Sequence, residues 1–222
     1  MFKNIYVYRF EFLLSSQGTV LFGSLLVPKD LFETTLSPIL FLANQLAGII
    51  LMSRKKKSIV VLTIKLAIIG VSASTAIFEV KKDKLFTFLN VIVSFLFYVL
   101  VTFEIIKQVW ESKEVNKNVI FGLISGYISL GLVGFFVCLS IEIASPGSFE
   151  GLKATINEPR YFVERLMYYS YITLMTIGYG EIIPVTSLAQ KAAILIGMLG
   201  QFYLVILTAV VVGKYVNKVN AN

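Results

Sequence analysis

The sequence predicts an all-α membrane protein with five or six transmembrane helices and one short re-entrant helix. Of its 222 residues, 57% are hydrophobic and 15% are charged, and the mean hydropathy is +0.82. The charges are gathered in short clusters between long apolar runs, whereas a soluble domain needs charged residues over its whole surface. Composition and patterning together therefore place the chain in the membrane class.

Six apolar runs are candidates for membrane-spanning helices, which need roughly 20 mostly apolar residues. Four runs meet this length, and a fifth is shorter but carries no charge. The sixth is the weakest because it contains several polar residues and is followed by Pro28, so it either spans the bilayer or lies in the interface. In chain order the weak run is 12–27, the short run is 36–52, and the long runs are 58–78, 85–106, 119–144 and 188–216.

The basic clusters predict the orientation of these helices. The densest cluster, residues 54–57, reads Arg-Lys-Lys-Lys, and such clusters favour the cytoplasmic side. Alternate crossings then place Lys214 and Lys218 inside and the loop 145–159 outside, whereas the lysine-containing loop 79–84 falls on the less favoured side. The net charge of +7 is expected to meet anionic lipid rather than nucleic acid, because no basic stripe alternates with aromatic residues.

Several functional classes are disfavoured by the residue types present. The chain has no histidine and a single cysteine, Cys138, so neither a zinc cluster nor an intrachain disulfide can form. The carboxylates are scattered and no nucleophile elbow is present, so we expect neither an enzyme nor a bound cofactor. A secondary transporter usually shows internal repeats and several broken helices. This sequence has no repeat, and the short run 161–175 is its one candidate for a broken helix.

The run 161–175 is apolar but too short to cross a bilayer, and Glu164 and Arg165 lie near its start. This pattern favours a re-entrant half-helix. Asn157 followed by Pro159 is a start signal for it. Glu142 lies near the outer end of the preceding span, where we expect it to meet lipid headgroups.

The residues after the half-helix have the chemistry of an ion-selective pore. A pore that replaces the water around a cation must offer stacked rings of oxygen atoms. An extended chain can turn successive carbonyls to one side only through backbone angles that glycine reaches freely, and Gly178 and Gly180 are two residues apart. Thr176 adds a hydroxyl at the inner end, while Ile177 and Tyr179 are expected to point away from the ions.

Such a strand cannot encircle an ion alone, but four copies around an axis can, which predicts a homotetramer. The carboxyl end of the half-helix, aimed at that axis, would carry roughly half a negative charge and favour a cation.

The stretch Thr176-Ile177-Gly178-Tyr179-Gly180 resembles the selectivity filter of the potassium channel superfamily. The resemblance implies a pore domain over residues 117–222, made of outer helix, pore helix, filter and inner helix, preceded by N-terminal transmembrane helices over residues 1–116. It implies passive K⁺ flux through the carbonyls of the first four filter residues and the threonine hydroxyl, with Gly180 completing the outer end. K⁺ would be the permeant ligand, and the protein would be a multi-pass protein of the plasma (inner) membrane.

The resemblance also assigns roles around the filter. Thr173 falls where the family's pore helix carries a threonine, and Tyr168 and Tyr169 fall where it carries an aromatic pair that packs around the filter. Gly200 matches the inner-helix glycine described as a gating hinge, although close helix packing is an equal alternative. The stretch from Gly200 to Leu204 looks like small bacterial members that lack a cytoplasmic sensor domain.

Two departures from the family pattern bear on function. Glu181 stands where the family usually has aspartate, and the longer side chain is expected to alter hydrogen bonding behind the filter, and so its stability and inactivation, without removing selectivity. A non-selective monovalent cation channel is the alternative function, but it would need a disrupted filter. The run 85–106 has no arginine ladder, so we expect weak or no intrinsic voltage dependence.

Within the membrane, Lys65 either pairs with Glu104 or extends to the interface. The sequence leaves two further possibilities open. An unidentified partner could regulate the protein, or the chain could be a subunit that conducts only together with another subunit.

Overall fold

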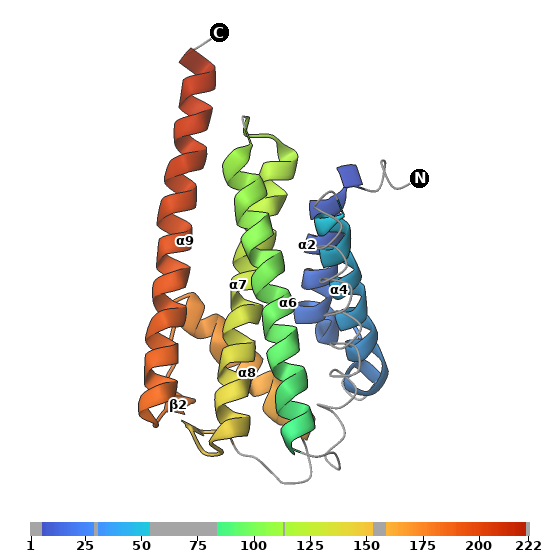
Figure 1. The fold of residues 1–222 in the computed structure, drawn as a ribbon, viewed down its shortest axis with the longest axis vertical. Coiled ribbons are helices and arrows are strands. Elements are labelled where there is room, and N and C mark those ends of the chain that lie inside the picture. The colour runs from blue at the N-terminus through green and yellow to red at the C-terminus, as the bar shows by residue number, and fades with distance from the viewer. Residues whose placement is uncertain (1–5, 29–30, 54–83, 113, 153–158, 221–222) are drawn as a thin grey trace. The chain divides into compact units, whose positions relative to one another are not determined.

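The computed structural model describes residues 6–28, 31–53, 84–112, 114–152 and 159–220 (Figure 1). The predicted span 58–78, Lys65 and Asn157 lie outside these residues. The described part is mostly helical. Its elements are α2 (Arg9–Phe22), η1 (Gly23–Leu25), η2 (Phe32–Leu36), α4 (Ser37–Met52), α6 (Lys84–Glu111), α7 (Lys117–Ala144), β1 (Phe149–Glu150), α8 (Pro159–Leu174), β2 (Ile183–Pro184) and α9 (Ser187–Asn220).

Three described helices, α6, α7 and α9, are long and apolar enough to cross a membrane. They confirm the predicted spans 85–106, 119–144 and 188–216 as helices of the required length. Helix α4 has 16 residues and α2 has 14, so both are shorter than the roughly 20 residues that a bilayer requires. Helix α2 begins earlier than predicted and passes at Gly23 into a 3₁₀ turn.

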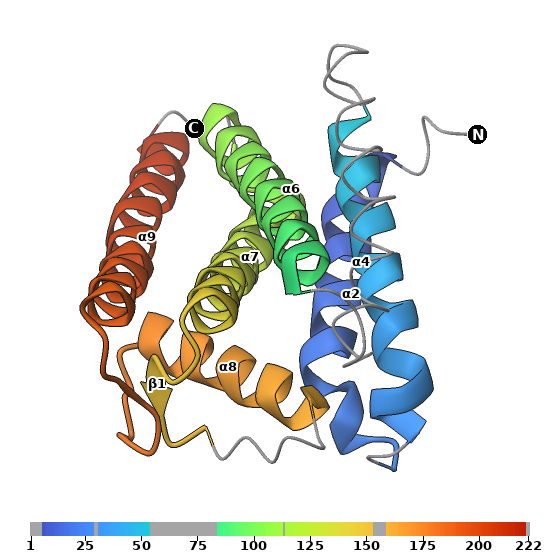
Figure 2. The same ribbon diagram turned by 60° about the horizontal axis from the view of Figure 1, so that its bottom comes forward.

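The contacts divide the chain into two compact units. The first comprises Met1–Ile64, Leu100–Ser129 and Phe202–Asn222. In this unit α2 packs along α4, and both views show the two helices side by side (Figures 1 and 2). The buried side chain of Gln17 donates a hydrogen bond of 2.6 Å to the Ser129 hydroxyl on α7. This bond satisfies a polar group in an otherwise apolar helix contact.

A polar network joins the start of α2 to the ends of α4 and α6 in the first unit. Arg9 Nε donates to Gln108 Oε1 at 2.7 Å, and Gln108 Nε2 donates to the buried Glu104 carboxylate at 2.8 Å. Gln108 Nε2 also lies 3.4 Å from the carbonyl oxygen of Leu51. Hydrogen bonding of this kind lets the buried carboxylate of Glu104 remain inside the helix packing.

Lys214 connects the end of α9 to the end of α6, again within the first unit. Its Nζ donates to the carbonyl oxygens of Trp110 at 2.6 Å, Ser112 at 2.7 Å and Val109 at 3.4 Å. The last carbonyls of a helix lack partners within the helix and carry partial negative charge. The ammonium group of Lys214 therefore caps α6 from a neighbouring helix.

The second unit comprises Lys65–Val99 and Leu130–Gln201. In it, α8 packs against α7 where Ser170 Oγ donates to the Gly131 carbonyl oxygen at 2.8 Å. The Tyr171 ring occupies the space that a side chain at position 131 would need. Glycine in α7 therefore allows the two helices to approach closely.

A short pair of strands lies in the second unit, one strand after α7 and the other after α8. Strands β1 and β2 pair antiparallel, with Phe149 opposite Pro184 (Figure 2). The Glu142 carboxylate accepts hydrogen bonds from the amides of Gly147 at 2.6 Å and Phe149 at 3.1 Å. The expectation that Glu142 meets lipid headgroups is wrong, because its side chain is buried and holds the turn between α7 and β1.

Candidate functional site

The candidate site is the irregular segment 175–181, here called the strand although it belongs to no sheet, which follows the carboxyl end of α8 directly. Helix α8 begins at Pro159, as predicted, and ends at Leu174. The amides of Met175, Thr176 and Ile177 donate to carbonyl oxygens in the last turn of α8, at 2.9, 3.0 and 2.8 Å. These bonds fix the start of the strand at the negative end of the helix dipole.

The backbone angle φ changes sign from residue to residue along the strand. Thr176, Gly178 and Gly180 have φ of 57°, 55° and 91°, and the residues between them do not share this positive φ. Alternation of left-handed and right-handed residues turns successive amides to one side and successive carbonyls to the other. A row of carbonyl oxygens is what a dehydrated cation binds, so the alternating φ makes the strand a candidate cation site.

Thr176 is the part of this pattern that the glycine spacing did not predict. Among the described residues it is the non-glycine with a positive φ. This conformation costs an ordinary residue about 1–2 kcal/mol, and it is unusual for a β-branched one. The local sequence carried no signal for it beyond the two-residue spacing from Gly178.

The apolar side chains of the strand are left uncovered by the described residues. Ile177 is 46% exposed and Tyr179 is 74% exposed. Large exposed apolar groups beside an irregular backbone mark a surface that contacts another molecule.

Glu181 is held at the outer end of the strand by Tyr168 on α8. A hydrogen bond from the Tyr168 hydroxyl lowers the pKa of the Glu181 carboxyl below its usual range, with a smaller effect from Arg165. Gly151, with φ of 88°, lies so close to the Glu181 carbonyl that a side chain there would overlap it. Arg165 Nη2 donates to the Gly151 carbonyl oxygen at 3.1 Å, which ties this loop to α8.

The two predicted aromatic residues point to different partners. Tyr169 is buried, and its ring lies edge-to-face with Phe149 at 5.2 Å between centroids. A hydrogen bond also joins the side chains of Tyr169 and Thr173. Tyr169 and Thr173 therefore pack α8 against β1, whereas Tyr168 contacts Glu181 at the outer end of the strand.

Gly200 lies where α9 approaches the end of α8. A side chain at this position would overlap the carbonyl oxygen of Leu174, and the helix is continuous through Gly200. This geometry favours the close-packing interpretation of Gly200, and a hinge role stays a prediction. The next residue, Gln201, donates from Nε2 to Thr176 Oγ1 at 3.2 Å, a contact that sequence reasoning missed.

The family model Ion_trans_2, described as an ion channel, matches residues 123–217. This range includes most of α7, all of α8, the strand and most of α9. The matched part of the chain is thus similar to ion channel pore domains. This agrees with the resemblance to the potassium channel superfamily. Together with the three apolar helices long enough to cross a membrane, it supports an ion channel in a membrane. No curated protein and no solved structure matches the chain.

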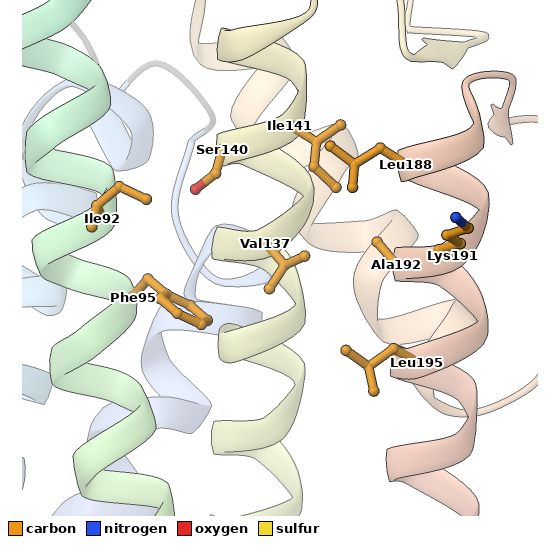
Figure 3. A pocket seen from close by; sticks show the side chains of 9 residues that line it. All are labelled: Ile92, Phe95, Val137, Ser140, Ile141, Leu188, Lys191, Ala192 and Leu195. Carbon is orange, nitrogen blue, oxygen red and sulfur yellow. The ribbon is translucent and has the colours of Figure 1, made fainter.

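The second unit also has a pocket of about 350 Å³, and none of the residues that line it belongs to the strand. Figure 3 shows its nine lining residues, which come from α6, α7 and α9, and only Ser140 and Lys191 among them are polar. No group of three carboxylates or thiols that could hold a metal ion occurs among the described residues.

Proposed function

We propose that this ion channel is selective for potassium and that K⁺ passes along the strand of four identical chains. The ions would bind the carbonyl oxygens of Thr176, Ile177, Gly178 and Tyr179 and the threonine hydroxyl, and Gly180 would complete the outer end. The single observation that carries the proposal is the alternating φ of the strand, because it aligns successive carbonyls on one side. K⁺ is then the permeant ligand, and the mechanism requires no cofactor.

Exposure in the single chain supports a homotetramer. Only 22% of the apolar window of α9 is buried, compared with 50% for α6 and 56% for α7. Irregular backbone at membrane depth is tolerated only when it is buried in protein or lines a water-filled path. The exposed strand therefore requires neighbouring chains, and rotation about a common axis is the arrangement that closes it.

The ends of the described helices support the proposed crossing pattern. In the first unit, the start of α2 and the ends of α4, α6 and α9 are linked through Gln108 and Lys214. Successive helices that cross in alternate directions would gather these ends on one side. We infer a protein of five or six spans in the plasma membrane, with α8 re-entrant, in which residues 1–116 surround the pore domain 117–222 and contact lipid or a regulator.

The test is the reversal potential of purified channels in planar bilayers, with K⁺ on one side and Na⁺ on the other. We expect reversal near the K⁺ equilibrium potential. Clear current that reverses near zero would contradict potassium selectivity and favour a non-selective cation channel. If no current flows, K⁺ binding to the purified protein is measured directly, and its absence would also contradict the proposal.

A glycine pair provides a matched control for this measurement. An added methyl group at Gly178 or at Gly18 meets no neighbouring atom, but only Gly178 has a positive φ. Gly178→Ala is therefore expected to abolish selective current through backbone strain alone. Gly18→Ala, within α2, is expected to leave the reversal potential unchanged.

A further inference from the structure

Gln201 brings an amide group to the inner end of the strand. Because Gly200 lets α9 approach the carbonyl of Leu174, the next residue along α9 lies level with Thr176. The Nε2 of Gln201 is 3.2 Å from Thr176 Oγ1, and both side chains are exposed in the single chain. The contact is therefore made at the open inner end of the strand rather than within the protein core.

The direction of this hydrogen bond matters for a cation at the same hydroxyl. A threonine hydroxyl has one proton and two lone pairs, and a cation binds through a lone pair. The Gln201 amide occupies one lone pair and places the positive end of its N–H dipole next to that oxygen. In surroundings poorer in water than bulk solvent, such a dipole acts strongly on a nearby charge.

We propose that Gln201 tunes the innermost cation site by weakening cation binding at the Thr176 hydroxyl. This inference rests on the proposed function, in which four copies of Thr176 form the inner ring of the filter. Four Gln201 amides then face that ring. Conduction requires binding that is weak enough for an ion to leave, and a donor on the hydroxyl lowers affinity most for a divalent cation.

The test is block by Ba²⁺, a divalent cation close to K⁺ in size, applied to the inner side of channels in planar bilayers. Gln201→Met keeps the length of the side chain and removes the amide. We expect the Ba²⁺ concentration for half block to fall about fivefold, equal to about 1 kcal/mol for the loss of the four amides together. Gln190→Met is the matched control, because Gln190 is also on α9 but donates to the Pro184 carbonyl. Block of the Gln190→Met channel by Ba²⁺ should not differ from that of the wild type.

A double-mutant cycle assigns the effect to the hydroxyl. In a Thr176→Ala background, Gln201→Met should no longer change the affinity for Ba²⁺, whereas in Thr176→Ser the fivefold effect should persist. If Thr176→Ala carries no current, the same cycle is read from the rise in thermal unfolding temperature that Ba²⁺ causes in the purified protein.

The outcomes separate this inference from the proposed function. A wild-type channel that reverses near zero contradicts potassium selectivity whatever Gln201 does. A potassium-selective wild type in which Gln201→Met leaves Ba²⁺ block unchanged, or weakens it, overturns the role of Gln201 alone. An effect of equal size in the Thr176→Ala background would also overturn it, because the amide would then act without the hydroxyl.

Discussion

At the scale of single residues, Glu181 shows how one extra methylene group is accommodated. The family pattern has aspartate at this position, and here the longer carboxylate accepts a hydrogen bond from Tyr168 on α8. A hydrogen bond to the charged form lowers the pKa of a carboxyl. Its contribution to stability is therefore present above the pKa of the unfolded chain, and it is lost as the pH falls through the lower pKa of the folded protein.

Tyr168→Phe is expected to raise the pKa of Glu181 toward its usual range, because the phenol that stabilises the charged carboxylate is removed. The outer end of the strand should then lose this support at a higher pH. The measurement is current against external pH, in which the acid midpoint should move upward.

Tyr169→Phe is the control for this shift, since Tyr169 bonds to Thr173 and packs on Phe149 rather than on Glu181. An acid midpoint that Tyr168→Phe leaves in place would show that the carboxylate does not govern the mouth of the pore.

At the scale of elements, the contact between α8 and α9 brings the start of the strand next to α9. Gly200 allows this approach, and the Gln201 bond to Thr176 follows from it. A second contact, from Lys214 to the end of α6, holds the far part of α9 within the first unit. In each of the two units α9 is thus attached to other helices, and in the first unit the Tyr203 hydroxyl also donates to the Leu123 carbonyl oxygen on α7 at 2.6 Å.

Gly200→Ala is expected to lower stability by about 1–3 kcal/mol, because its methyl group would overlap the Leu174 carbonyl and force the helices apart. The measurement is the thermal unfolding temperature of the detergent-solubilised channel. Gly197→Ala is the matched control, since a methyl group there would lie 3.8 Å from the nearest atom, the Thr173 carbonyl oxygen.

The same pair distinguishes packing from hinge motion at Gly200. Unchanged stability in Gly200→Ala together with altered opening would contradict the close-packing interpretation and favour a hinge.

At the scale of the whole molecule, a single chain leaves the strand and much of α9 exposed. Ile177, Tyr179 and much of α9 are exposed although they are apolar. Lipid can cover the apolar face of a helix, but it cannot satisfy the backbone groups of an irregular strand. Assembly of identical chains satisfies both requirements at once.

The purified channel is therefore expected to have a mass of four times the 24.8 kDa of one chain. Native mass spectrometry of protein released from detergent measures this directly, after lipid and detergent are removed in the gas phase. A monomeric or dimeric mass for protein that still conducts would contradict the four-chain pore.

The sequence by itself determined the membrane class, three of the spans, the start of α8 at Pro159 and the position of the strand. These features are local, because span length, proline and the spacing of glycines act over one turn or one helix. The family match over residues 123–217 agrees with the class of function that these patterns indicated.

Only the tertiary structure decided the positive φ of Thr176, the buried role of Glu142 and the partners of Tyr168, Gln201 and Lys214. The Gln201 contact joins residues 25 apart in sequence, and the Lys214 contact to Ser112 joins residues 102 apart. No local pattern encodes which distant groups meet, because that depends on how closely helices pack. Hydrogen bonds at those contacts then fix the side chains, and with them the chemistry of the strand.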